Sequence, residues 1–568
     1  MKNILLTIAC SVLLVSCDFL DRPALDSMTD EDYWETEENV RSFVWGFYPS
    51  YFVGYGSGDT WGSFFTGGGT TDDYSSTSVS KFNDIVPTSG GGWTFEYIRK
   101  ANILIDRVQR VSMSDEAKAH WTGVGRFFRA MEYSDLSRAF GDFPWYDQEL
   151  KETDPVDVLY RPRDSRVFIA QKIIEDFEYA VANIRVQDGT EQLTINRNVA
   201  LAYMSRQMLY FGTLFKYHDV DAALSKTMLE KAKWAADEVI KSGKYSISDD
   251  YLKLFTSLSL AKNPEIILYR EYETAIVTHN VHTYNGPEAQ TGASQSLMES
   301  YLCTDGKPIK VSSLYQGNTT FAKFMSNRDP RMALCFRPKL HLQGITANYS
   351  TTGYSSKKFF SPELEGTSDG SGSRNTTDAP VMRYAEVLLN YAEASAELGT
   401  ISQNDLDKSI NLIRARKGVN MPPLSVDVAV ADPANNHGVN DLIWEIRRER
   451  RVEMCFEGLR NKDLKRWKQW DKLDTEKNIA INRGAYVNPA NFATEVEGFK
   501  AGGKTTARIV DANGNEVAAG AAGLIKPAFS TKREFLDARI YLDPLPMDQI
   551  TLYKDKGVEL TQNPGWIN

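Results

Sequence analysis

Apolar residues recur at every third or fourth position over most of this chain, which is the spacing of one face of an α-helix. One uninterrupted stripe consists of Leu201, Met204, Met208, Phe211 and Phe215. The pattern predicts helices over residues 30–47, 95–111, 114–140, 163–184, 198–216, 224–242, 381–398, 404–417 and 440–457. Alanine-rich seams let partner helices approach closely. We therefore expect a mainly α fold with tetratricopeptide-like helix pairs, although no strict period of about 34 residues is visible.

Three segments lack this period. Residues 49–93 alternate glycines with tyrosines and tryptophans, so we predict a long ordered loop that carries aromatic side chains. Residues 245–380 are mixed, with short strands expected at 245–247 and 266–269 and a flexible glycine-rich run at 366–372. Residues 480–530, rich in Gly, Ala and Asn, indicate a peripheral insertion.

The N-terminus has its own pattern: Lys2 precedes an apolar run over 4–15, which is too short to span a bilayer and predicts a secretory signal. The run ends Leu14-Val15-Ser16-Cys17, which resembles a bacterial lipobox. In bacterial lipoproteins the cysteine thiol is acylated, and two or more acyl chains anchor a protein stably. The alternative is a plain signal peptide with a chance cysteine.

Composition narrows the function. A chain of 568 residues is long enough for two or more packed lobes. The net charge of −10 argues against nucleic acid and against electrostatic docking to anionic lipid. Besides Cys10 and Cys17, the cysteines are Cys303, Cys335 and Cys455, which cannot all pair. No spacing indicates zinc, so we expect no cofactor; a structural calcium ion is the alternative, although the sequence has no recognisable EF-hand loop.

Several stretches, in chain order, resemble one family. They are Cys17 with Phe19-Leu20-Asp21, Phe128-Arg129-Ala130-Met131-Glu132-Tyr133 with Gly141-Asp142-Phe143-Pro144, Asn327-Arg328-Asp329-Pro330-Arg331, Arg383-Tyr384-Ala385-Glu386-Val387, Arg448-Glu449-Arg450-Arg451 with Glu457-Gly458-Leu459-Arg460, and Gln562-Asn563-Pro564-Gly565. Together they resemble the SusD/RagB family, surface lipoproteins of nutrient-uptake systems in Bacteroidetes.

The resemblance implies a signal peptide over 1–16, a SusD-like N-terminal portion over 17–245 and a C-terminal portion over 246–568. It also implies a non-catalytic protein that binds a glycan and acts as the lid of a SusC-like TonB-dependent transporter. We expect a lipid anchor at Cys17 in the outer membrane and display at the cell surface. Asp18 departs from the pattern, because in some other bacteria it retains lipoproteins in the inner membrane.

Sugar rings pack on aromatic faces, and their hydroxyls need polar partners. In the glycine-rich loop, Asp72, Asp73 and Trp93 offer both chemistries, and we expect Trp93, behind three glycines, to be the most exposed. Relatives also use loops of the middle portion. The candidates there are Tyr284, Asn285, Tyr301, Cys303 and Arg374. For each of them the alternative is packing within the fold or, for Arg374, a solvated loop charge.

Two rival functions stay open. Glu449, Glu453 and Glu457 share a helix face and could bind a metal or act in acid–base chemistry, but neighbouring arginines favour a structural row of ion pairs. A lipid-anchored glycoside hydrolase would need two carboxylates across a cleft. A protein-interaction scaffold would use the helix pairs and have no sugar site.

Overall fold

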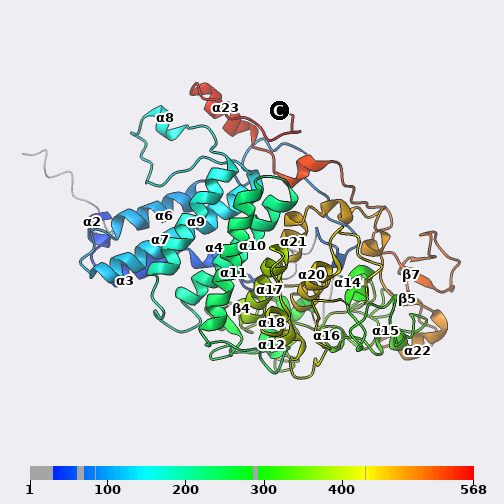
Figure 1. Ribbon diagram of the computed structural model, residues 1–568. Helices are drawn as coiled ribbons and strands as arrows, with labels where there is room; N and C mark the ends of the chain where they lie inside the picture. Colours follow the sequence, from blue (N-terminus) through cyan, green and yellow to red (C-terminus); the bar gives the residue numbers. More distant parts are fainter. Residues whose placement is uncertain (1–29, 61–69, 84, 286–291, 429, 568) are drawn as a thin grey trace, which may run out of the picture.

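The computed structural model describes residues 30–60, 70–83, 85–285, 292–428 and 430–567, without the side chains of 31, 32 and 285. The predicted lipobox, with Cys17 and Asp18, lies outside these residues. Helices dominate and the strands are short, which confirms the mainly α class (Figure 1). Over the described ranges, none of the helices combines the length and the apolar character that a membrane crossing requires.

The N-terminal half is a stack of helices, at the left of Figure 1. They are α2 (Asp30–Tyr33), α3 (Glu37–Trp45), α4 (Tyr48–Tyr51), α6 (Glu96–Arg107), α7 (Asp115–Phe140), α8 (Val156–Leu159), α9 (Arg166–Asn183), α10 (Arg197–Tyr217) and α11 (Ala222–Lys241). Side chains cap the helix starts: Ser114 accepts from the Ala117 amide and Asp221 from the Leu224 amide. Helix α6 packs on α7, α7 on α9, and α10 on α11, so consecutive helices form the predicted pairs.

The rest of the chain has shorter elements. They are α12 (Lys253–Thr256), α13 (Val281–Asn285), α14 (Gln295–Ser300), α15 (Phe321–Met325), α16 (Pro330–Cys335), α17 (Tyr384–Glu397), α18 (Gln403–Asp407), α19 (Ile410–Arg414), α20 (Asp441–Glu453), α21 (Arg460–Arg466), η1 (Trp470–Leu473), η2 (Ile479–Asn482), η3 (Pro489–Asn491), α22 (Phe492–Glu495), η4 (Ala538–Tyr541) and α23 (Met547–Asp555). Helix α17 packs on α11 and α10, so one hydrophobic core runs through both predicted portions. The division at 245/246 stays a prediction.

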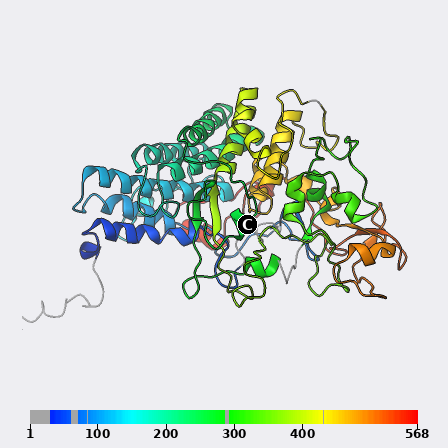
Figure 2. The same cartoon turned by 90° about the horizontal axis from the view of Figure 1, so that it is seen from below.

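Three small antiparallel sheets complete the fold. Strand β2 (Ile266–Arg270) pairs with β4 (Ala379–Arg383), and β1 (Tyr74–Ser75) pairs with β3 (Gly292–Ala293). In the third sheet, β7 (Gly523–Ile525) lies between β5 (Tyr486–Val487) and β6 (Ile509–Val510). This sheet lies at the far end of the molecule from α3 (Figure 2), yet Val487 and Ile525 are buried, so the predicted insertion is anchored by its own core contacts. The predicted strand at 245–247 is wrong, because this segment is irregular.

The row of glutamates on and after α20 is a structural ion-pair network, as predicted, but its partners are not the neighbouring arginines. Glu453 pairs with Arg331, Arg383 and Arg416 at 2.7 to 3.0 Å. Glu449 pairs with Arg331 at 2.6 Å. These arginines come from α16, from β4 and from the turn that follows α19, so the network ties together segments that are far apart in the sequence. The family-like motifs therefore include scaffold residues.

Candidate functional site

The two loop regions predicted to form the sugar site lie side by side. Pairing of β1 with β3 brings them together, and the Ser294 amide donates to the Asp73 carbonyl at 2.8 Å. The Gly58 amide also donates to the Thr278 carbonyl at 2.7 Å. A third loop joins them, because the His279 amide donates to the Asn375 carbonyl at 3.0 Å. Segments 53–60, 272–284 and 364–376 thus converge, although several predicted side chains lie beneath this surface.

Asp72 and Asp73 are buried and hold the loop to the scaffold. Arg460 donates two 2.8 Å hydrogen bonds to the Asp72 carboxylate, and Arg451 donates one of 2.8 Å to Asp73. Burial alone would raise the pKa of Asp72, but Arg451 and Arg460 outweigh it and hold that pKa below its ordinary value. The prediction that both carboxylates face sugar hydroxyls is therefore wrong for this arrangement, because their oxygens already bind guanidinium groups.

Trp93 is buried as well, with 7% of its surface exposed. Its amide donates to the Gly90 carbonyl in a tight turn, and its ring centroid lies 4.3 Å from that of Phe143 and 5.1 Å from that of Phe140. All three preceding glycines have positive φ, so the turn directs the chain back to the core. The expected exposure of Trp93 is wrong.

The candidates in the middle region differ in how far their side chains are buried. Tyr301 and Cys303 are fully buried, so neither presents a surface to a sugar. Tyr284 is half-buried on α13, and the side chain of Asn285 lies outside the described part of the chain. Arg374 is exposed and folds back on its own loop, donating to the Ser368 carbonyl at 2.8 Å. Cys303, Cys335 and Cys455 are all free thiols.

A cavity of about 570 Å³ lies between the two halves; we call it the central cavity. Its wall consists of residues from α4, α7, α10, β4, α17 and α21, of the connection before α21, and of loop residues at 53, 54, 70 and 80. Because these stretches are far apart in the sequence, no local motif indicated the cavity. One charged residue of the cavity wall, Lys462, lies within the charge-dense motif Leu459-Arg460-Asn461-Lys462-Asp463 of the sequence.

Most charges in the wall of the central cavity are paired. Arg206 donates to both oxygens of Glu386 at 2.6 and 2.5 Å. Arg383 pairs with Glu457 at 2.7 Å. Lys462 is different: over the described ranges it makes no hydrogen bond or ion pair, although its side chain is exposed to the cavity. The positive charge of Arg138 is the largest cause that lowers the pKa of Lys462, to about 8, and the reduced hydration of the ammonium group within the cavity wall adds to it.

A tyrosine and a glutamate lie at the α4 side of the central cavity. Tyr51 lines the cavity, and its hydroxyl donates to Glu132 at 2.5 Å. Burial raises the pKa of the Glu132 carboxyl to about 7. A titratable group with such a shift beside a cavity is typical of functional sites, although structural groups also show such shifts.

A second cavity of about 430 Å³ lies among α14, α20 and η2. Trp444 lines it and is half-buried, with its indole nitrogen donating to Asp432 at 2.9 Å. Its arginines are paired: Arg448 with Asp432, and Arg460 with Asp72. Throughout the described ranges, no three His, Cys, Asp or Glu side chains are grouped to hold a metal ion.

Comparison with known proteins finds SusD-like relatives. Residues 333–566 match the model of the SusD family. This part of the chain therefore resembles SusD family members. SusD-like protein P38 of Formosa agariphila is 22% identical over 537 residues, which are 87% of this chain and 94% of that protein.

Two solved structures share the fold of this chain. A SusD-like protein of Bacteroides fragilis has a TM-score of 0.67 at 21% identity, covering 96% of this chain and all of the other. A SusD-like carbohydrate-binding protein of the same species has a TM-score of 0.65 at 20% identity, covering 92% and 99%. The likeness extends over almost the whole chain, so both halves share the fold of these two SusD-like proteins.

Proposed function

We propose that this protein is a SusD-like surface lipoprotein that captures a glycan in the central cavity and acts as the lid of a SusC-like TonB-dependent transporter. The observation that carries the glycan-binding role is the central cavity itself, a concave space of about 570 Å³ between the two halves that both polar and apolar residues line. A structural relative of this chain is described as carbohydrate-binding.

The lining suits a polyhydroxylated ligand. Ser50, Gln207 and Asn461 offer hydroxyl and amide groups, which can donate to and accept from sugar hydroxyls. Tyr51 offers an aromatic face of the kind on which the C–H face of a sugar packs. Ion pairs such as Arg206–Glu386 complete the wall, and each partner orients the side chain of the other.

A blocking substitution tests the site. Ser80 is exposed and lines the central cavity, so Ser80→Trp should place an indole in it and lower glycan affinity at least about tenfold, because the ligand and the indole need the same volume. The matched control is Ser78→Trp, an exposed position on the same loop that does not line this cavity. Affinity electrophoresis against a polysaccharide panel, followed by calorimetry, measures the change.

The outcomes separate the alternatives. Unchanged binding by Ser80→Trp together with loss in Trp444→Ala would move the site to the second cavity. Absence of binding to every glycan would favour the interaction scaffold. Release of reducing ends, abolished by replacing one carboxylate, would make the protein a hydrolase.

The lid role has its own measurement. A lid must bind its transporter, so the protein extracted in mild detergent should copurify with a β-barrel transporter. Its repeated absence from the purified material would contradict this part of the proposal and leave the glycan-binding part untouched.

A further inference from the structure

We propose that the central cavity selects an anionic saccharide, a sugar that carries a carboxylate or a sulfate group, and that Lys462 is the residue that recognises this group. The inference rests on the proposed glycan-binding role of the cavity and adds the class of ligand.

The first step is the position of Lys462. It stands on the first turns of α21, lines the central cavity and is exposed within it. No carboxylate of the described residues lies within ion-pair distance of its ammonium group. An ammonium group that solvent can reach can donate three hydrogen bonds, and none of the described residues accepts one from Lys462.

The second step is the set of charges around it. Helix α7 contributes Asp135 and Arg138, which pair with each other at 2.6 Å. Helix α10 contributes Arg206 and α17 contributes Glu386, which also pair with each other. Both acids near Lys462 are thus committed to arginines, and the repulsion of Arg138 on Lys462 is the largest influence on its pKa. Lys462 therefore adds a positive charge that these neighbours leave uncompensated.

The third step is the chemistry of the missing partner. A carboxylate or sulfate oxygen bound to Lys462 would form a charge-assisted hydrogen bond and relieve the repulsion from Arg138. A neutral sugar hydroxyl would form a weaker hydrogen bond with Lys462 and would relieve less of the repulsion from Arg138. The hydroxyl and amide groups of Ser50, Gln207 and Asn461 remain for the uncharged part of the ring. The cavity thus combines a site for one anionic group with a surface for a polyol.

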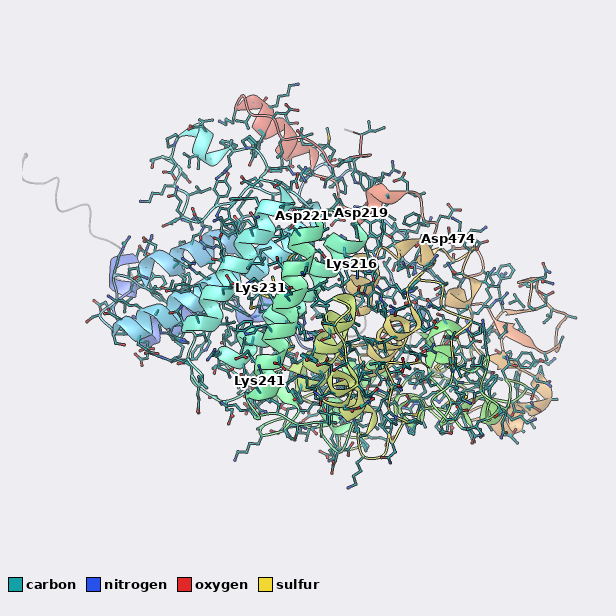
Figure 3. The ribbon with its side chains drawn as sticks, viewed as in Figure 1. Lys216, Asp219, Asp221, Lys231, Lys241 and Asp474 are labelled. Carbon is teal, nitrogen blue, oxygen red and sulfur yellow. The ribbon has the colours of Figure 1, made fainter. Side chains whose placement is uncertain are left out.

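The test compares glucuronate, a sulfated glucose and neutral glucose as probes, with binding measured by ligand-detected NMR and calorimetry. Wild-type protein should bind at least one anionic probe about tenfold more tightly than glucose. Lys462→Met should lose this preference, and Lys462→Arg, which keeps the charge, should retain it. Because Lys462 makes no ion pair, Lys462→Met should fold. The control is Lys241→Met, because Lys241 is the last residue of α11 (Figure 3) and is not among the residues that line the cavity.

A second readout does not depend on affinity alone. In reductively methylated protein, the NMR signal that is missing from Lys462→Arg reports the titration of Lys462, and its pKa should rise when the anionic probe is added. Which probe raises it identifies the group, carboxylate or sulfate. Equal binding of glucose and both anions, failure of both anions to bind, or an unchanged preference in Lys462→Met would overturn the inference.

The failures are distinguishable. If Ser80→Trp abolishes sugar binding but Lys462→Met keeps the preference for anions, the cavity is the glycan site and only the role of Lys462 is wrong. If Ser80→Trp binds every probe as wild type does, the proposed site itself fails.

Discussion

Glu132 is a single buried carboxyl whose ionisation should be visible in the stability of the protein. Its pKa is raised from 4.5 to about 7 by burial. Between these two values the folded state binds more protons than the unfolded state, so stability falls as pH rises through this window and levels off above it. Glu132→Gln keeps an oxygen for the Tyr51 hydroxyl and cannot ionise. At about pH 8 it should be more stable than wild type by up to about 3 kcal/mol, measured by denaturant unfolding.

The control for Glu132 is a matched change at an exposed position. Glu152→Gln should leave the free energy of unfolding within about 0.5 kcal/mol of wild type at both pH values. At about pH 5 the advantage of Glu132→Gln should be small, because wild-type Glu132 is then protonated in the folded state. An advantage of equal size at both pH values would contradict the assignment of the effect to ionisation.

Trp93 shows why single aromatic residues were misjudged. The glycines before it correctly indicated a turn, but a turn does not specify on which side the next ring lies. Phe140 and Phe143 surround the indole, and they follow it by almost fifty positions. That contact depends on how the end of α7 meets the loop, which is tertiary information. Asp72 was misjudged for the same reason, because its arginine partner, Arg460, is remote in sequence.

Elements were easier to predict than residues, because a helix depends on local spacing. The stripe from Leu201 to Phe215 predicted a helix over 198–216, and α10 spans Arg197–Tyr217. Its start follows from the Asn196 cap, which is visible in the sequence. The prediction for 381–398 was incomplete, because residues up to Arg383 extend as β4 against β2 before α17 begins. Pairing with a strand more than a hundred residues earlier has no local signal.

At the scale of elements, α20 predicts a strong effect of one substitution. Glu453 is fully buried and serves three arginines, so Glu453→Gln should leave buried guanidinium groups short of an anion. Removing one member of such a network typically costs about 3–5 kcal/mol of stability. The control is Glu230→Gln, which removes an exposed surface pair with Lys226 and should cost less than about 1 kcal/mol. Denaturant unfolding of both variants at neutral pH measures the difference.

The pH dependence of this loss has a definite sign. Burial alone would raise the pKa of Glu453, but Arg416, Arg383 and Arg331 outweigh it and lower that pKa from 4.5 to about 2. The stabilisation that ionised Glu453 provides is therefore complete above about pH 4.5, and it is lost as the pH falls toward about 2. The gap between wild type and Glu453→Gln should narrow over that window, and a gap that widens there would contradict the ion-pair account.

At the scale of the whole molecule, the order of motifs was sufficient to predict the likeness to SusD-like proteins and the helical scaffold, and the loops were not sufficient to predict the site. The motif residues Arg331, Arg383 and Glu453 meet in one buried network, so these motifs report the scaffold of this chain. The cavity wall, in contrast, depends on where several loops and helices meet. Lys462 lies inside a recognisable motif, but its lack of a partner is a property of the assembled fold.

The anchor is the last prediction and concerns the whole chain. We predict that attachment by lipid at Cys17 holds the protein at the membrane, because the sequence that ends at this cysteine resembles a lipobox. A net charge of −10 gives no attraction to anionic lipid that could replace it. Cys17→Ala should therefore move the protein from the membrane pellet to the soluble fraction, measured by fractionation and immunoblotting, and Cys17→Ala that still pellets would contradict the lipobox. Protease treatment of intact cells that produce the wild-type chain then tests the face: cleavage indicates surface display, whereas protection would indicate that Asp18 retains the protein inside.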